Sequence, residues 1–190
     1  IAGGTLNMAG GNNPIEYSAS GNSVLQISSG TLTVGAQIRR SPTSNIGTLD
    51  YTQSGGTVIV GENAATVNNR GVFEILNPGS AFNMSGGDLY ICRQQTSPLL
   101  ASFYFDPDVN NISPAANIHI GHPSLTPPNQ TISIYAGAEL PKLHVYGNNN
   151  PTARLDIVPA YISKLLQVDA GATFNANGKD LYLSGDMSIA

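Results

Sequence analysis

The stretch Gly55-Gly56-Thr57-Val58-Ile59-Val60 joins a glycine turn to a short run of β-branched and apolar residues, and the chain repeats this combination. In each copy the turn is followed by an apolar residue, any residue and a second apolar residue. Five copies carry a glycine in the turn and two lack it. A repeat of this kind determines the whole architecture and therefore outweighs local patterns. The first apolar residues of the seven copies are Leu6, Leu32, Val58, Leu89, Ile118, Leu143 and Leu181.

The spacing of the copies indicates short strands. Successive copies lie 26, 26, 31, 29, 25 and 38 residues apart. A 26-residue unit has room for about three strands with turns between them, and the first unit fits strands at 5–8, 15–18 and 24–28. Apolar residues alternate with polar ones, as in Thr131-Ile132-Ser133-Ile134, and no 3.6-residue apolar face is sustained. We therefore predict an all-β, right-handed parallel β-helix of about six coils, each with three short strands.

Stacking of the coils assigns the two sides of the repeated strand. Equivalent strands pair in parallel about 4.8 Å apart, so six steps give a rod segment roughly 30 Å long. The first and third residues of each copy point inward, from Leu6 and Met8 through to Leu181 and Leu183. The residue between them points outward. The outward column is expected to contain Asn7, Thr33, Ile59, Tyr90, His119, His144 and Tyr182.

Two regions depart from the repeat. Nine of the twelve prolines lie between Pro98 and Pro159, so residues 93–130 are expected to be irregular, with loops at 93–111 and 122–130 projecting from the rod. The 38-residue last interval is expected to contain an extra bend at 159–164. Residues 79–91 align without gaps onto 171–183, which predicts equivalent places in the fold.

An antiparallel sandwich or a propeller is the competing architecture, but two-residue hairpin signals are few.

The composition excludes several classes of protein. Only 20 of 190 residues are charged and the net charge is −4, so the chain lacks the basic footprint of a nucleic-acid binder. The longest nearly apolar stretch, 157–162, is too short to span a bilayer and contains Pro159. The single Cys92 excludes an internal disulfide framework, and its position after an inward residue predicts an inert thiol. Glycine, asparagine, serine and threonine make up 71 residues, which suits tight turns between strands.

The phrases Gly-Gly-Thr-Leu at 3–6 and Gly-Ala-Thr-Phe-Asn-Ala-Asn-Gly-Lys-Asp-Leu-Tyr-Leu at 171–183 resemble those of large repetitive bacterial surface proteins. The stretch 54–60 is similar to the repeats of autotransporter passenger β-helices. Residues 143–147, 153–157 and 166–183 look more like the giant adhesins that Bacteroidota export by the type IX system. The resemblance implies a secreted, surface-attached, elongated bacterial stalk or adhesin, and it transfers no catalytic residue.

The most direct functional expectation is structural. The chain starts at Ile1, without an initiator methionine or an apolar leader, so we expect one β-helix segment, 1–190, of a longer chain. Its partners would be flanking coils of that chain, with surface glycans or neighbouring cells as further candidates. The alternative is a carbohydrate-active β-helix, a polysaccharide lyase or hydrolase. That chemistry needs carboxylates at equivalent positions of adjacent coils, whereas Asp88 and Asp180 share a repeat position several coils apart.

One candidate binding site lies in the outward column. Tyr90, His119 and His144 occupy one column in successive coils and could form a strip on which sugar rings stack. His119 and His144 would lie roughly 5 Å apart. With His122, which follows three residues after His119, they could also bind a transition metal. The simpler interpretation is an exposed aromatic ladder without a ligand.

A candidate metal site lies in the irregular region. In Asp106-Pro107-Asp108-Val109-Asn110 the oxygen-bearing side chains stand at positions one, three and five, as in loops that bind Ca²⁺. An EF-hand would continue with glycine at six and glutamate at twelve, where this chain has Asn111 and Asn117. The alternative is a solvated turn in which the side chains bond to nearby backbone. No other cofactor and no catalytic residue are predicted.

Overall fold

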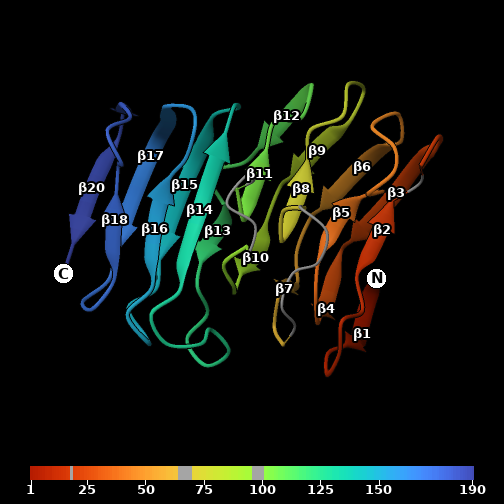
Figure 1. Ribbon diagram of the computed structural model, residues 1–190, viewed down its shortest axis with the longest axis horizontal. Helices are drawn as coiled ribbons and strands as arrows, with labels where there is room; N and C mark the ends of the chain where they lie inside the picture. The colour runs from red at the N-terminus through yellow and green to blue at the C-terminus, as the bar shows by residue number, and fades with distance from the viewer. Residues whose placement is uncertain (18, 64–69, 96–100) are drawn as a thin grey trace.

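The computed structural model describes residues 1–17, 19–63, 70–95 and 101–190. In this part of the chain the regular elements are strands, and every paired strand runs parallel to its neighbour. Figure 1 shows the chain advancing along the long axis of the molecule, with the N- and C-termini toward opposite ends. The strands fall into three sheets that form the faces of a solenoid. The molecule is therefore a three-faced parallel β-helix, as the repeat predicts.

Each sheet collects the equivalent strands of successive coils. Sheet A contains, in spatial order, β1 (Ala2–Met8), β4 (Ser29–Val34), β7 (Thr57–Val60), β10 (Gly87–Ile91), β13 (Ala116–Ile120), β15 (Leu140–Val145), β17 (Ala160–Val168) and β19 (Leu181–Leu183), with β20 (Asp186–Ile189) also paired to β17. Sheet B contains β2 (Ile15–Tyr17), β5 (Ile38–Arg40), β8 (Phe73–Ile75), β11 (Phe103–Phe105), β14 (Thr131–Ala136), β16 (Thr152–Leu155) and β18 (Thr173–Asn175). Sheet C contains β3 (Asn22–Ile27), β6 (Thr48–Gln53), β9 (Ala81–Met84) and β12 (Val109–Ile112).

The first coil has the three strands that the sequence predicts, β1, β2 and β3, although position 18 lies outside the described residues. The inward columns of sheet A are also confirmed from the second to the sixth level. There the side chains from Leu32 and Val34 to Leu143 and Val145 are at most 1 % exposed. The register places Asn7, Thr33, Ile59, Tyr90, His119 and His144 in one outward column, as predicted.

The expected last level of the repeat is wrong. Leu143 pairs with Leu166, and Leu166 pairs with Met187, so the column has eight levels where seven copies were expected. Leu181 and Leu183 pair instead with Ala160 and Ile162, near the start of β17. The expected bend at 159–164 is mostly part of β17 itself. The last coils are only 23 and 21 residues long, and Leu166 lies inside the nine-residue strand β17 and not directly after a turn.

The prediction of the outward column is also wrong at its last position, where Tyr182 was expected. Tyr182 pairs with Tyr161, and their rings stack with centroids 4.5 Å apart. The place next to His144 is taken by Gln167.

Residues 93–130 are more regular than predicted. The range contains β11, β12 and β13, which pair in register with strands of the preceding coil. Part of the predicted loop at 93–111, residues 96–100, lies outside the described residues. The segment 122–130 carries no strand, in agreement with the prediction of a loop. In the described ranges, no helix is long and apolar enough to cross a membrane.

Sheet C ends at β12 because its interior column changes from apolar to polar. Leu25, Tyr51 and Phe82 occupy successive levels of that column, and Asn110 takes the next one. Its side-chain amide donates to the carbonyl oxygen of Glu139 at 2.8 Å. The coil after β12 therefore stacks on the amide of Asn110, whereas the coils after β6 and β9 stack on the rings of Tyr51 and Phe82. From β14 onward the chain passes to β15 through residues 137–139 without a sheet C strand.

Candidate functional site

The outward face of sheet A gathers the polar and aromatic side chains that the repeat singled out. Strands β10, β13, β15 and β17 place Tyr90, His119, His144 and Gln167 side by side, one from each coil. Their inward neighbours, such as Leu89 and Ile118, are buried in the core and fix the register of the strands. The apolar pair in each copy of the repeat therefore sets the position of the polar residue between them.

Two carboxylates complete this face and turn the histidines into a hydrogen-bonded row. His119 Nε2 lies 2.9 Å from Asp88 Oδ1, and His144 Nε2 lies 2.9 Å from Asp169 Oδ1. The two Nδ1 atoms face each other at 3.2 Å. We call Asp88, His119, His144 and Asp169 the histidine–carboxylate row.

Further amides hold the two carboxylates in place. Asn117 Nδ2 donates to Asp88 Oδ1 at 3.1 Å. Gln167 Nε2 donates to Asp169 Oδ1 at 3.0 Å. Each carboxylate of the row is therefore oriented by an amide as well as by an imidazole, and the two amides come from β13 and β17.

Aromatic rings surround the histidines. The ring of Tyr90 stacks on His119 with centroids 4.3 Å apart and an interplanar angle of 15°. Tyr146, just after β15, lies 4.2 Å from His144 and 5.3 Å from His119 by ring centroids. His122 packs against the edge of Tyr90 at 4.8 Å. These contacts leave His119 only 6 % exposed, although it stands on the outward face.

The electrostatics of the face follow from this burial. Desolvation lowers the pKa of His119 below its ordinary value, although the hydrogen bond to Asp88 opposes the shift. Burial also lowers the pKa of His122. Burial acts to raise the pKa of Asp169, but the hydrogen bonds from Gln167 and His144 outweigh it and lower that pKa overall. Burial raises the pKa of Tyr90, with a further contribution from its hydrogen bond to Tyr146.

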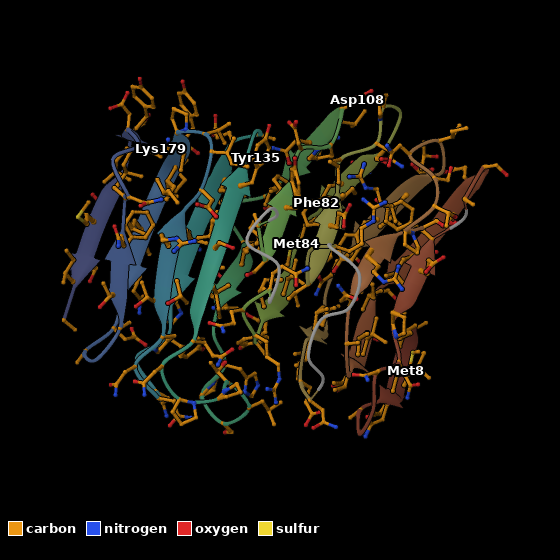
Figure 2. All side chains as sticks on the ribbon, in the orientation of Figure 1. Met8, Phe82, Met84, Asp108, Tyr135 and Lys179 are labelled. Atoms are coloured by element: carbon orange, nitrogen blue, oxygen red, sulfur yellow. The ribbon has the colours of Figure 1, made fainter. Side chains whose placement is uncertain are left out.

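The residues predicted to bind calcium have separate protein partners. Asp108 accepts a hydrogen bond from the backbone N–H of Gly79 at 2.7 Å and lies at the rim of the molecule, beyond the interior Phe82 (Figure 2). Asn110 stands in the interior column of sheet C and donates to Glu139. Burial raises the pKa of Asp106, and the charge of Asp108 adds to that effect. The calcium site stays a prediction.

A second charged cluster lies on sheet B. Glu74, in β8, is fully buried and contacts the guanidinium groups of Arg40 and Arg70. Its Oε2 accepts the backbone N–H of Gly71 at 3.0 Å. Arg40 also donates to Asn77 Oδ1 at 3.0 Å. Burial raises the pKa of Glu74 although both arginines act to lower it. Because Glu74 is fully buried against arginines from other parts of the chain, the cluster joins coils and presents no reactive group at the surface.

Cys92 has the inert environment that its position predicts. The side chain is fully buried and forms no disulfide. Burial raises the pKa of its thiol to about 12, so the thiolate that reacts or binds metals is not formed near neutral pH. In the described residues, no group of three or more histidine, cysteine, aspartate or glutamate side chains is placed to hold a metal ion.

The outward column of the repeat predicted Tyr90, His119 and His144, but neither the two carboxylates nor Tyr146. Asp88 lies two residues before Tyr90 on the same strand, so strict period-two alternation would have placed it on the same face. Asp169 could not be found, because the coil that carries it is the one the repeat missed. Tyr146 directly follows β15 and is brought over the histidines by the turn.

Comparison with models of known protein families, with curated proteins and with solved structures gives no match.

Proposed function

We propose that the chain is a non-catalytic structural segment of an elongated, secreted or cell-surface bacterial fibre or adhesin. The observation that carries this proposal is the exposure of core columns at both ends of the rod. Leu6, at the first level, is 47 % exposed, and Met187 and Ile189, at the last, are 49 % and 69 % exposed. In the intervening levels the same columns are buried.

Stacking of further coils would bury these residues. Within the described residues, β1 pairs only with β4 and β20 only with β17, so each has a free edge. A neighbouring coil would pair with that edge and cover the apolar side chains, each worth about 1.5–3 kcal/mol when fully buried. Because each coil of a solenoid contacts only its neighbours, rod length and stability increase with coil number. Flanking coils of the same chain are the partners that we propose.

The location and export route rest on the sequence resemblance. The turn phrases at 3–6 and 171–183 are similar to those of bacterial surface proteins, which are exported and extend from the cell. We place the segment outside the cell on that basis, with the type IX system as the proposed route. A low content of charged residues and a rod built from small polar turns are compatible with a stalk.

End-to-end association of the purified chain tests the structural proposal. Analytical ultracentrifugation over a range of concentrations should show self-association, and electron microscopy should show rods one coil wide. Replacing Met187 and Ile189 together by lysine should reduce the association. Ile46→Lys is the matched control, because Ile46 is 74 % exposed but lies between β5 and β6, away from the ends. A cooperatively folded chain that stays monomeric at all concentrations would contradict the proposal.

Glycan binding is a second candidate function, favoured by the cluster of rings around Tyr90, His119 and His144. Aromatic faces with neighbouring carboxylates are suited to sugar rings and their hydroxyl groups. Binding to a glycan array that is lost in Tyr90→Ala would support an adhesive role. Tyr161→Ala is a suitable control, since Tyr161 is an exposed tyrosine elsewhere on sheet A.

Catalysis on polysaccharides receives less support from the geometry. Glu74 is fully buried beside Arg40 and Arg70, and Asp88 and Asp169 are each bonded to a histidine and an amide. A lyase or hydrolase needs an acid and a base free to reach a substrate. Absence of polysaccharide cleavage by the purified chain is the expected result.

A further inference from the structure

The histidine–carboxylate row has three positions for a hydrogen bond, and two neutral imidazoles carry only two protons to fill them. Ionised carboxylates only accept, so His119 Nε2 and His144 Nε2 must both carry protons to bond Asp88 and Asp169. A neutral imidazole carries a proton on one nitrogen only. Both Nδ1 atoms are then bare lone pairs, and they face each other at 3.2 Å. Two lone pairs at this distance repel unless a cation lies between them.

We propose that a divalent transition-metal ion, of the Zn²⁺, Co²⁺, Ni²⁺ or Cu²⁺ class, binds between His119 Nδ1 and His144 Nδ1. Two nitrogen ligands at about 2.0–2.1 Å from a tetrahedral ion stand roughly 3.3 Å apart. The observed separation of 3.2 Å matches that geometry. Neutral imidazole nitrogen is a preferred ligand for these ions, whereas Mg²⁺ and Ca²⁺ prefer oxygen.

The surroundings of the pair are those of a built metal site. Histidines that bind metals usually donate their second ring N–H to a carboxylate, which fixes the tautomer and the ring orientation. Here both histidines do so, through Asp88 and Asp169. The imidazole of His119 is 7 % exposed and that of His144 is 17 % exposed, so neither ring is free to turn away. The ligands are therefore oriented before the metal arrives.

The site supplies two protein ligands and leaves the other coordination positions to solvent. In the described part of the chain, the two histidines are not joined by a third histidine, cysteine, aspartate or glutamate placed to hold the same ion. His122 uses its Nδ1 to accept the backbone N–H of Ser124 at 3.1 Å and packs against Tyr90. Open positions on a bound ion could accept an oxygen or nitrogen ligand from outside the chain.

Isothermal titration with Zn²⁺, and absorption spectroscopy with Co²⁺, test the proposal on the whole chain. We expect one equivalent of metal per chain, lost in His119→Ala and in His144→Ala. His122→Ala is the matched control and should bind as the unaltered chain does. Asp88→Asn and Asp169→Asn keep both ligands but weaken the carboxylate partner of each, and should lower the affinity about 10- to 100-fold.

Three results would overturn the proposal. One is that the His144→Ala chain, shown by circular dichroism to be folded, still takes up one equivalent of metal. Another is loss of uptake in His122→Ala alone. The third is no uptake by the unaltered chain; a ¹⁵N NMR spectrum showing one proton shared between the two Nδ1 atoms would then assign the missing charge to a proton. If His119→Ala and His144→Ala fail to fold, an unchanged affinity in Asp169→Asn contradicts the proposal instead.

Discussion

The ring of Tyr51 lies parallel to the ring of Phe82 in the next coil, with centroids 4.7 Å apart and an interplanar angle of 3°. Phe82 also meets Phe73 and Phe105 edge-on, with centroids 6.0 Å and 4.9 Å away. Both Tyr51 and Phe82 are fully buried. These rings fill the interior where sheets B and C face each other, and they connect successive coils as the aliphatic columns do in sheet A.

Phe82→Ala should therefore lower the free energy of unfolding by about 3–5 kcal/mol, because it removes a packed ring and leaves a cavity that its neighbours cannot fill. Denaturant unfolding followed by circular dichroism measures the loss. Val24→Ala is the control, since Val24 is 69 % exposed on β3 and its truncation should change stability by no more than about 0.5 kcal/mol. Equal effects of the two substitutions would show that the aromatic column contributes little.

Glu74→Gln should destabilise the chain by about 3–5 kcal/mol, because it leaves the guanidinium group of Arg40 largely buried without its counter-charge. Arg70 loses its carboxylate partner in the same substitution. Asp156→Asn is the matched control: Asp156 lies 3.4 Å from Arg154, whose side chain is 39 % exposed, so the expected loss is below about 1 kcal/mol. Urea unfolding of both variants gives the comparison, and a smaller loss for Glu74→Gln would contradict the assignment.

The sequence predicted correctly those coils in which a turn is followed directly by an apolar pair. Leu32, Val58, Leu89 and Ile118 follow that rule and form one column. The rule fails at Leu166, because Leu166 lies inside the continuous strand β17 and its coil is shorter, so the pattern was assigned to Leu181 instead. A repeat recognised by a turn followed by an apolar pair misses a level that lies within a longer strand.

The alignment of 79–91 with 171–183 predicted equivalent places in the fold, and this prediction is wrong for the first strand of each segment. Phe82 belongs to β9 in sheet C, whereas the matching Phe174 belongs to β18 in sheet B. The phrase describes a strand, a turn and a strand, and both segments have that local structure. Which face of the solenoid the first strand joins depends on the length of the coil, and that is a tertiary property. For the same reason the partnership of His144 with Asp169 was beyond prediction.

Cys92 should resist modification until the chain unfolds. Burial raises its pKa to about 12, so at pH 8 the folded chain presents almost no thiolate to a disulfide reagent. The reaction rate should rise steeply in denaturant, in parallel with unfolding. The unfolded thiol ionises near pH 9 and the folded one near 12, so stability contributed by Cys92 is complete below pH 9 and declines as the pH rises toward 12. A Cys92→Ala chain should show a weaker decline over that interval, and rapid modification of the folded chain would contradict the prediction.

Gly56→Ala should be among the most damaging small substitutions, for two separable reasons. Gly56 has φ of +73°, a left-handed conformation that costs other residues about 1–2 kcal/mol. A Cβ atom there would also lie 2.5 Å from the carbonyl oxygen of Gly30 in the preceding coil. That oxygen is backbone within a paired ladder and cannot move aside without disturbing the stacking of two coils.

Gly4→Ala separates these two causes. Gly4 has the same φ of +73°, but a Cβ atom there would meet nothing within 4 Å. It should therefore lose only the conformational 1–2 kcal/mol or so, whereas Gly56→Ala should lose about 1–3 kcal/mol more from the contact. Thermal or denaturant unfolding of the two variants measures the difference. If both substitutions cost the same, the turn glycines serve the backbone conformation alone; a larger loss at Gly56 means that they also set how closely one coil can approach the next.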